Sequence, residues 1–295
     1  RAFIMPDIVL FVNGIALAVV ECKKGSETCA NPMQEAFVQL QRYMHKRPAT
    51  ALAGLKEGEP RLFHSNLLLI RSSGTQADYG SITSEQEHFY AWKTLHPQDD
   101  AALAGMNAQQ QLVAGMLNKA NLLQILRTSA VFMDTDSGHR VKVVCRYQQF
   151  RAAHKIAQRL RAGGTALQRS GVVWHTQGSG KSLTMVFLAR MLRASTDLND
   201  YKIILVNDRT DLEDQLGETA TLIGGRVNII ENRQELRRQL ATDSSDVNMV
   251  MVHKFQEHKA VLSNTVAEAL GTYLAIPAGQ TFGVVNRSDR IILLI

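Results

Sequence analysis

Residues 171–190 read GVVWHTQGSGKSLTMVFLAR, and the fold expected for this chain follows from that stretch. The apolar residues 172–174 predict a buried strand, and the apolar residues after Ser182 predict a helix. A turn that contains glycine and ends in Gly-Lys-Ser separates the two. A strand, a glycine-rich turn and a helix in this order are typical of a phosphate-binding loop.

The residue types in this turn match what a chain of phosphates requires. Gly178 and Gly180 have no Cβ, so backbone N–H groups can curl around an anion there. The start of the helix adds the positive end of its dipole. We expect Lys181 to reach the phosphates and the Ser182 hydroxyl to coordinate Mg²⁺. The strict pattern begins with glycine, and His175 occupies that position in this chain.

The composition describes a globular protein of one large or two ordinary domains. The chain has 295 residues, of which 45% are hydrophobic and only 6 are proline. It contains no secretory signal and no apolar run long enough to span a bilayer. Cys22, Cys29 and Cys145 are odd in number and lack paired C-x-x-C spacing. This usage argues against a disulfide framework or a zinc site, and it favours a reducing, cytoplasmic compartment.

Positive charge gathers around the phosphate-binding loop. The net charge is +6, and no Asp or Glu occurs between Asp136 and Asp197, although Lys and Arg are frequent there. A one-sided basic excess beside such a loop favours a polyanionic partner such as nucleic acid. A solvated basic face is the alternative.

A β-hairpin is predicted by residues 5–24, MPDIVLFVNGIALAVVECKK, because two apolar runs flank Asn13-Gly14. Asp7 lies at its open end on one strand, with Glu21 and Lys23 on the other. Glu21 and Lys23 are two residues apart, so they share a face of the strand. Paired carboxylates beside a lysine suit Mg²⁺-dependent hydrolysis of phosphodiesters, because carboxylates hold this hard cation. A surface hairpin with charged ends is the alternative.

The register of this hairpin decides whether the two carboxylates can share a metal ion. A two-residue turn pairs positions whose numbers add up to 27, which places Asp7 opposite Val20 and Glu21 on the other face. Asp7 and Glu21 come opposite each other only if an extra residue shifts the sum to 28. We therefore predict an irregularity in the ladder between Asp7 and Glu21.

The segment after the hairpin has helical spacing. Residues 31–44, NPMQEAFVQLQRYM, carry an apolar stripe, and Gln39 and Tyr43 stand one turn apart on one face. Together with Pro6-Asp7 and Glu21-Cys22-Lys23, this segment resembles the PD-(D/E)xK nuclease core of the motor subunit of type I restriction enzymes. That nuclease domain has a Gln-x-x-x-Tyr helix as an additional signature. The resemblance implies that Gln39 and Tyr43 help to position the DNA or the catalytic groups.

Further elements are expected along the chain. Residues 63–70 predict a core strand, 71–74 a loop, and 101–126 helical structure at the junction of two domains. Residues 141–160 predict a short strand followed by an amphipathic basic helix. More core strands are expected at residues 202–207, 227–230, 247–252 and 289–295. The alternation of strands with helices predicts a parallel, doubly wound sheet.

Two short motifs resemble parts of helicase-like motors. In such motors a glutamine upstream of the loop reads the adenine ring, and RYQQF at residues 146–150 offers Gln149, favoured over Gln148. A polar helix cap is the alternative for this glutamine. DRTDL at residues 208–212 resembles a strand-end loop that touches the DNA backbone, which implies Arg209 and Thr210 as contacts. An ordinary helix start is the alternative for Arg209.

The ordered elements MPD…ECK, QLQRY, RYQQF, HTQGSGKSLTM and NDRTDLEDQL resemble the restriction (motor–nuclease) subunit of a type I restriction-modification enzyme. The implied fold is α/β. A PD-(D/E)xK endonuclease domain occupies residues 1–126, and a partial RecA-like parallel-sheet domain of the superfamily 2 helicase type occupies residues 127–295. The implied cofactors are Mg²⁺, held by Asp7, Glu21 and Ser182, and ATP. The phosphates of ATP would be held by Thr176, Gln177, Gly178, Ser179, Gly180, Lys181 and Ser182.

The implied activity is ATP-driven translocation on double-stranded DNA from an unmodified site, followed by Mg²⁺-dependent cleavage away from that site. The implied partners are methylase (modification) and specificity subunits, and the implied compartment is the cytoplasm of a bacterium or archaeon, away from membranes. We expect the first part of the nuclease fold and the Walker B acids to lie outside this chain, so that this piece alone does not hydrolyse ATP. The alternatives are a stand-alone helicase–nuclease of DNA repair or anti-phage defence, and a non-catalytic DNA-binding P-loop module.

Overall fold

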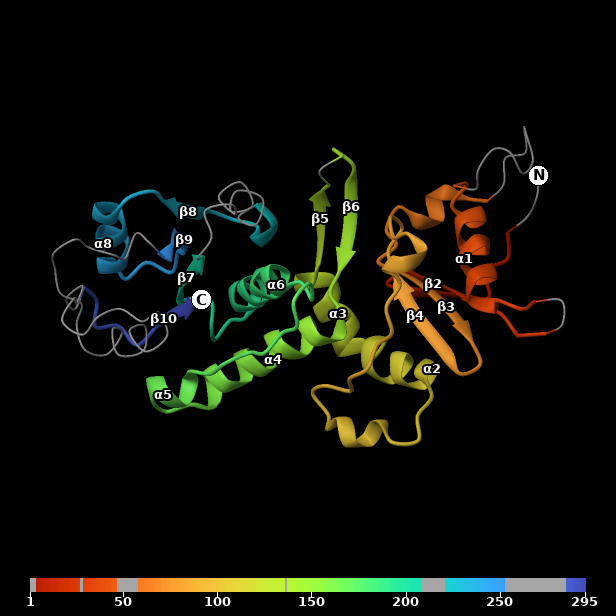
Figure 1. The fold of residues 1–295 in the computed structure, drawn as a ribbon, viewed down its shortest axis with the longest axis horizontal. Coiled ribbons are helices and arrows are strands. Elements are labelled where there is room, and N and C mark those ends of the chain that lie inside the picture. The colour runs from red at the N-terminus through yellow and green to blue at the C-terminus, as the bar shows by residue number, and fades with distance from the viewer. Residues whose placement is uncertain (1–3, 27–28, 47–57, 136, 208–220, 253–284) are drawn as a thin grey trace. The chain divides into compact units, whose positions relative to one another are not determined.

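The computed structural model describes residues 4–26, 29–46, 58–135, 137–207, 221–252 and 285–295. The chain divides into two compact units, residues 1–154 and residues 155–295 (Figure 1). Each unit has its own sheet and its own core.

The first unit is built on a four-stranded sheet in the order β1-β2-β3-β4. Its strands are β1 (Ile8–Val12), β2 (Ile15–Cys22), β3 (Leu68–Ser73) and β4 (Gln76–Gly80). β2 and β3 run parallel, and the two outer pairs are antiparallel. The predicted hairpin is confirmed. The strand expected at 63–70 begins only at Leu68, because Pro60–Phe63 form a 3₁₀ turn, and it continues through Ser73.

Helix α1 (Pro32–Tyr43) follows the hairpin and confirms the helix predicted at residues 31–44. The side chain of Asn31 caps its first turn by accepting a hydrogen bond from Gln34 N at 3.2 Å. Leu40 and Tyr43 are buried on its inner face and pack in a core with Val19 of β2 and other apolar residues. This packing fixes α1 against the sheet.

Short helices and a hairpin complete the first unit. The helices are α2 (Ala108–Gln111), the π-helical turn η4 (Leu112–Met116) and α3 (Lys119–Thr128), in the region where helical structure was expected. β5 (Ala130–Asp134) and β6 (Arg140–Val144) pair as a two-stranded hairpin.

Hydrogen bonds tie this hairpin to the first unit. Ser81 Oγ donates to the carbonyl oxygen of Lys142 at 2.6 Å, and Lys142 N donates to Thr83 Oγ1 at 2.7 Å. The two compact units divide between His154 and Lys155, within α4 (Tyr147–Ala162).

The second unit contains a four-stranded sheet in the order β10-β7-β9-β8, and every pair in it is parallel. The strands are β7 (Lys202–Asn207), β8 (Val227–Ile230), β9 (Val247–Met251) and β10 (Ile291–Leu294). All four strands expected after the phosphate-binding loop are thus present, and the predicted parallel sheet is confirmed. The helices of this unit include α5 (Ala166–Arg169), α6 (Lys181–Ala194) and α8 (Arg233–Ala241).

Residues 172–174 do not form the strand that the sequence predicted. The side chains of Val172, Val173 and Trp174 are 74%, 45% and 88% exposed. The run pairs with no strand among the described residues, and β10 pairs there only with β7. Three residues without ladder hydrogen bonds gain too little to hold an extended backbone. The prediction was wrong because a strand needs a partner as well as an apolar run.

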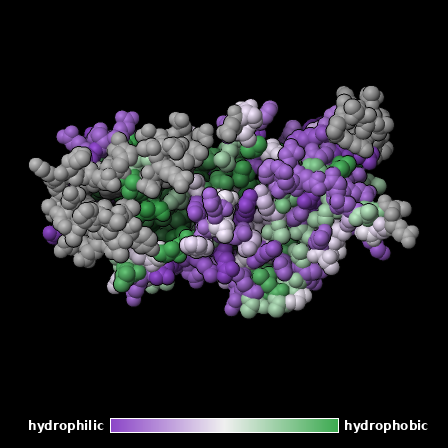
Figure 2. All heavy atoms as spheres, viewed as in Figure 1, coloured by the Kyte–Doolittle hydropathy of each residue, from purple (hydrophilic) through white to green (hydrophobic). Residues whose placement is uncertain are grey.

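The surface of the first unit is largely hydrophilic in the view of Figure 2, with an apolar patch over the region of α2. No helix in the described part of the chain combines the length and the apolar character needed to cross a membrane. Cys22, Cys29 and Cys145 are free thiols.

Asp78→Ala is expected to destabilise the first unit by about 3–5 kcal/mol, because it leaves a buried guanidinium without its counter-charge. Arg71, which is 7% exposed, donates to both carboxylate oxygens of Asp78, at 2.6 and 3.0 Å. Its guanidinium also lies 4.5 Å from the centre of the Phe89 ring. Urea unfolding of the two proteins measures the difference.

The matched control for this substitution is Glu59→Ala, which breaks a surface ion pair of the same type. The side chains of Arg61 and Glu59 are 81% and 45% exposed, so we expect a loss below about 1 kcal/mol. Equal effects of the two substitutions would contradict the structural role of the buried pair.

Candidate active sites

The β1–β2 hairpin contains the irregularity that the sequence predicted. Near the turn Val12 pairs with Ile15, so the paired numbers add up to 27. Farther from the turn Leu10 pairs with Ala18, and the sum becomes 28 because Leu17 is an extra residue. This shift confirms the predicted β-bulge.

The shifted register brings Asp7 and Glu21 to one end of the hairpin. The last pair of the ladder is Ile8 with Val20, so continuing it by one residue sets Asp7 opposite Glu21. Asp7 Oδ2 accepts a hydrogen bond from the backbone N–H of Cys22 at 2.7 Å. This bond holds the Asp7 side chain beside the strand that carries Glu21 and Lys23.

Glu21 and Lys23 form an ion pair at this end of β2. Glu21 is 1% exposed, and its Oε1 accepts a hydrogen bond from Lys23 Nζ. Partial burial lowers the pKa of the Lys23 amine, but the hydrogen bond to Glu21 and the charges of Glu21 and Asp7 outweigh it. The pKa is therefore raised, and Lys23 is a cation at neutral pH. It is suited to stabilising an anion and not to removing a proton.

The two carboxylates suit a hard divalent cation. Glu21 Oε2 is buried and has no hydrogen-bond partner, and such an atom is costly unless a positive group meets it. Asp7, in contrast, is exposed and open to an incoming ligand. No group of three or more His, Cys, Asp or Glu side chains in the described ranges is placed to hold a metal ion. Mg²⁺ commonly binds through one or two carboxylates, waters and substrate phosphate, so this donor set fits it.

Gln39 and Tyr43 of α1 connect to the same end of the hairpin. Gln39 Nε2 donates to Tyr43 Oη at 3.2 Å, and Tyr43 Oη donates to the carbonyl oxygen of Met5 at 3.0 Å. Met5 lies two residues before Asp7, so these two hydrogen bonds fix the backbone just before Asp7. Burial raises the pKa of Tyr43, which keeps its hydroxyl protonated as a donor. The sequence suggested the pair, but not its contact with Met5.

Arg71 is a neighbour of this site that the sequence analysis assigned to a loop. It lies in β3, directly beside Glu21 in the parallel β2–β3 ladder and beside Asp78 in the β3–β4 ladder. Its Nη1 is buried without a hydrogen-bond partner. One arginine at the end of an apolar run belongs to no motif. Only the pairing of β2 with β3, which are distant in sequence, would have revealed it.

The phosphate-binding loop of the second unit has the backbone that its sequence predicts. Gly178 and Gly180 have φ angles of 74° and 79°, in the left-handed region that favours glycine. Ser179 N donates to Thr176 O at 3.2 Å, which closes the turn. α6 begins directly afterwards, and Lys181 and Ser182 are exposed on its first turn.

Helix α6 holds this loop firmly. Among its buried residues are Val186, Phe187, Leu188 and Ala189, which follow one another along the chain. Four consecutive buried positions show that α6 is covered on most of its circumference, as expected for a helix inside a unit core. The packing of α6 therefore holds its first turn in place, including the backbone N–H groups and Lys181 that could bind an anion.

The remaining predicted residues lie in different surroundings. Gln149 is 2% exposed, and its Oε1 accepts a hydrogen bond from Arg146 N at 2.8 Å, so it caps the start of α4. Gln148 beside it is exposed. Arg209 and Thr210 lie outside the described residues.

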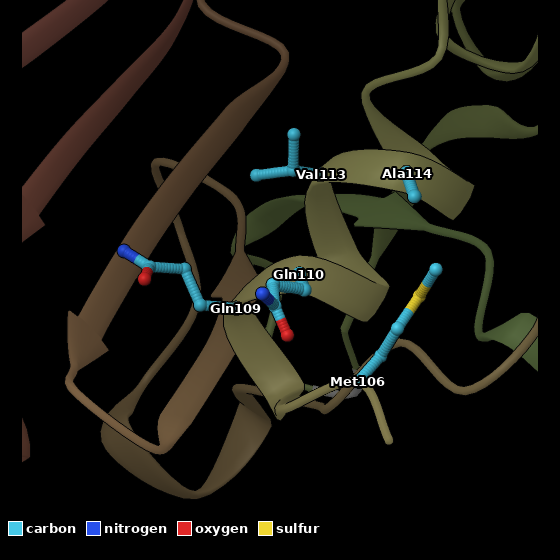
Figure 3. Close-up of a pocket in the computed structure, with 5 residues that line it drawn as sticks. All are labelled: Met106, Gln109, Gln110, Val113 and Ala114. Carbon is cyan, nitrogen blue, oxygen red and sulfur yellow. The ribbon is translucent and has the colours of Figure 1, made fainter. Parts of the chain in front are cut away.

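A shallow hollow on the first unit is separate from these residues. It is lined by Met106, Gln109, Gln110, Val113 and Ala114, which come from α2, from η4 and from the turn before them (Figure 3). The lining contains no charged or nucleophilic side chain, so the hollow supplies no acid, base or metal ligand.

Comparison with known proteins adds family relationships to this geometry. The family model described as SWI2/SNF2 ATPase matches residues 148–295, and the model described as type I restriction enzyme R protein N terminus (HSDR_N) matches residues 2–88. The chain is 31% identical to the Type I restriction enzyme HindI endonuclease subunit of Haemophilus influenzae, over 85% of this chain and 23% of that protein.

Two further relatives have similar coverage. Identity is 24% to the putative type I restriction enzyme MjaIXP endonuclease subunit of Methanocaldococcus jannaschii, over 86% of this chain and 24% of that protein. Identity is 26% to the Type I restriction enzyme SauCOLORF180P endonuclease subunit of Staphylococcus aureus, over 88% and 25%. The chain thus spans about a quarter of the length of these relatives.

The parallel sheet and the phosphate-binding loop, within the residues that the ATPase model matches, define a SWI2/SNF2-type ATPase domain. The residues before it, which carry the carboxylate hairpin, match the start of restriction R proteins. The chain belongs to the family of endonuclease (R) subunits of type I restriction enzymes.

Proposed function

We propose that this chain supplies the nuclease centre and part of the ATP-driven motor of a type I restriction enzyme. The complex translocates on double-stranded DNA and cuts unmodified DNA away from its recognition site. The observation that carries the proposal is the β-bulge, which sets Asp7 opposite Glu21 beside the cationic Lys23. A surface hairpin has no need of a register shift that aligns two carboxylates.

The nuclease centre is a PD-(D/E)xK site. Asp7 and Glu21 would hold Mg²⁺, which when bound polarises the scissile phosphate and activates water. Lys23 places a positive charge where the phosphate gains negative charge during the reaction. Gln39 and Tyr43 position the site, because the Tyr43 bond to Met5 O fixes the backbone before Asp7 and the Tyr43 hydroxyl also interacts with the Glu21 carboxylate.

The motor site binds ATP at the start of α6. Residues 176–180 offer backbone N–H groups to the phosphates, and Lys181 neutralises their charge. The Ser182 hydroxyl would hold the Mg²⁺ that accompanies the nucleotide. Gln149, which lies at the start of α4, contacts the adenine, and the exposed Gln148 beside it is the alternative for this contact. Arg209 and Thr210 contact the DNA backbone.

Two partner subunits would supply sequence recognition and methylation. We assign DNA sequence recognition to a specificity subunit and protection of the host sites to a methylase subunit. The support for this assignment is the family relationship, since each relative named above is called an endonuclease subunit of a type I restriction enzyme.

The test is Mg²⁺-dependent cleavage of plasmid DNA by the full assembly with Asp7→Ala. Because the substitution removes one of two carboxylate ligands, we expect cleavage to fall at least about 100-fold, a loss of about 3 kcal/mol or more. Glu87→Ala is the control, since the Glu87 side chain is 81% exposed. Cleavage that persists in Asp7→Ala would favour a DNA-binding P-loop module with structural carboxylates.

A further inference from the structure

His175 stands at the first position of the phosphate-binding loop, where the strict pattern has glycine. Its ring Nδ1 lies 3.2 Å from Ser179 Oγ. The imidazole therefore links the start of the loop, at His175, to Ser179 near its end. The turn between them is the part that would receive the phosphates. Glycine in this position has no side chain with which to make this link.

The hydrogen bonds of Ser179 determine which ring nitrogen carries the proton. Ser179 Oγ donates to Thr176 O at 2.7 Å, and a serine hydroxyl has only one hydrogen to donate. Towards His175 the hydroxyl is therefore the acceptor, and Nδ1 is the donor. His175 Nε2 is then the unprotonated ring nitrogen, and it is buried without a hydrogen-bond partner. A second proton would add at this nitrogen.

Burial and a neighbouring positive charge keep the His175 ring neutral when no nucleotide is bound. Burial lowers the pKa of His175, and the positive charge of Lys181 lowers it further. Residues 171–180 contain no other ionisable side chain. In the described part of the chain, Lys181 is the charged group that acts on the ring. The phosphates of a nucleotide would bring the negative charge that this end of α6 lacks.

We propose that His175 takes up a proton when the loop binds the phosphate chain of a nucleotide, and so acts as an occupancy-sensing residue of the motor. The inference rests on the proposed ATP-binding role of the loop. Several negative charges placed beside Lys181 offset its repulsion of an imidazolium and stabilise the protonated ring. The proton adds at Nε2, while Nδ1 keeps its bond to Ser179.

The sign of the pH dependence follows from linkage. The nucleotide-bound state holds more protons than the free state, so affinity is greatest at low pH. Affinity falls as pH rises between the pKa of free His175 and its higher pKa in the bound state. Within this window the slope is at most about tenfold per pH unit, because one proton is exchanged.

Isothermal titration calorimetry tests this inference on the full-length protein, with the non-hydrolysable triphosphate AMP-PNP and Mg²⁺. Titrations in buffers of different ionisation enthalpy give the number of protons taken up. We expect up to about one proton per nucleotide for the wild type at about pH 7. His175→Asn keeps an N–H donor for Ser179 but does not titrate, so we expect binding without this proton.

A histidine away from the loop provides the matched control. His139 is exposed in the turn between β5 and β6, and His139→Asn should take up the same proton as the wild type. If His175→Asn does not bind AMP-PNP, His175→Gln takes its place.

The possible outcomes separate this inference from the proposed function. Binding without proton uptake in the wild type, or equal uptake in His175→Asn, would overturn the role of His175 and leave ATP binding intact. Failure of the wild type to bind AMP-PNP would overturn the ATP-binding role itself, and the inference with it. Uptake that is lost only in the His175 variants supports the proposal.

Discussion

Lys181→Ala is expected to abolish both ATP hydrolysis and DNA cleavage in the full assembly. Lys181 is exposed on the first turn of α6, directly after the left-handed Gly180. Its amine is the positive side chain that this loop offers to the phosphates, and charge stabilisation of a phosphoryl group is worth several kcal/mol. We expect the rate of ATP hydrolysis to fall at least about 100-fold. Cleavage falls with it, because the proposed cutting follows translocation.

Lys155→Ala is the control for this substitution, because it removes the same charge from an exposed position of α4. It should hydrolyse ATP at close to the wild-type rate. A steady-state phosphate-release assay on both variants measures the effect. ATP hydrolysis that survives in Lys181→Ala would mean that the loop is not the motor site.

Lys23→Ala is expected to separate the two activities, with ATP hydrolysis retained and cutting abolished. Lys23 belongs to the first unit, where its amine is bonded to Glu21, and its pKa is raised despite partial burial. Its loss removes the cation beside the carboxylates proposed to bind metal but leaves the loop before α6 unchanged. We expect cleavage to drop at least about 100-fold, the size of effect found when one charge-stabilising donor is removed from an active site.

Lys24→Ala is the matched control for Lys23→Ala. Lys24 is exposed and follows Lys23 directly, so Lys24→Ala removes an equal charge beside the site. Cleavage of supercoiled plasmid and ATP hydrolysis are measured on the same preparations. Wild-type cutting by Lys23→Ala would show that the hairpin carboxylates and their lysine are structural.

The bulge in the β1–β2 hairpin shows how much a sequence can reveal when two requirements conflict. The Asn13-Gly14 turn fixes one register, and the metal site proposed for Asp7 and Glu21 requires another. An extra residue is the simplest way to satisfy both, and Leu17 is that residue. The start of α1 and the strands of the second unit were also predictable, because their signals lie within a few residues.

Arg71 and residues 172–174 show where such reading fails. Arg71 came beside Glu21 through the pairing of two strands that are distant in the chain, which no local pattern encodes. Residues 172–174 have the composition of a buried strand, yet they pair with no strand in the described ranges. In both places the deciding interaction is non-local.

Anomalous diffraction from crystals of the full-length protein soaked in Mn²⁺ tests the central claim most directly. Mn²⁺ prefers the same carboxylate and water ligands as Mg²⁺ and is visible by its anomalous signal. We predict a peak in contact with the carboxylates of both Asp7 and Glu21, where Glu21 Oε2 is buried without a hydrogen-bond partner. The peak should be absent from crystals of Asp7→Ala. No peak at these carboxylates in the wild type, or a peak there that persists in Asp7→Ala, would contradict the account.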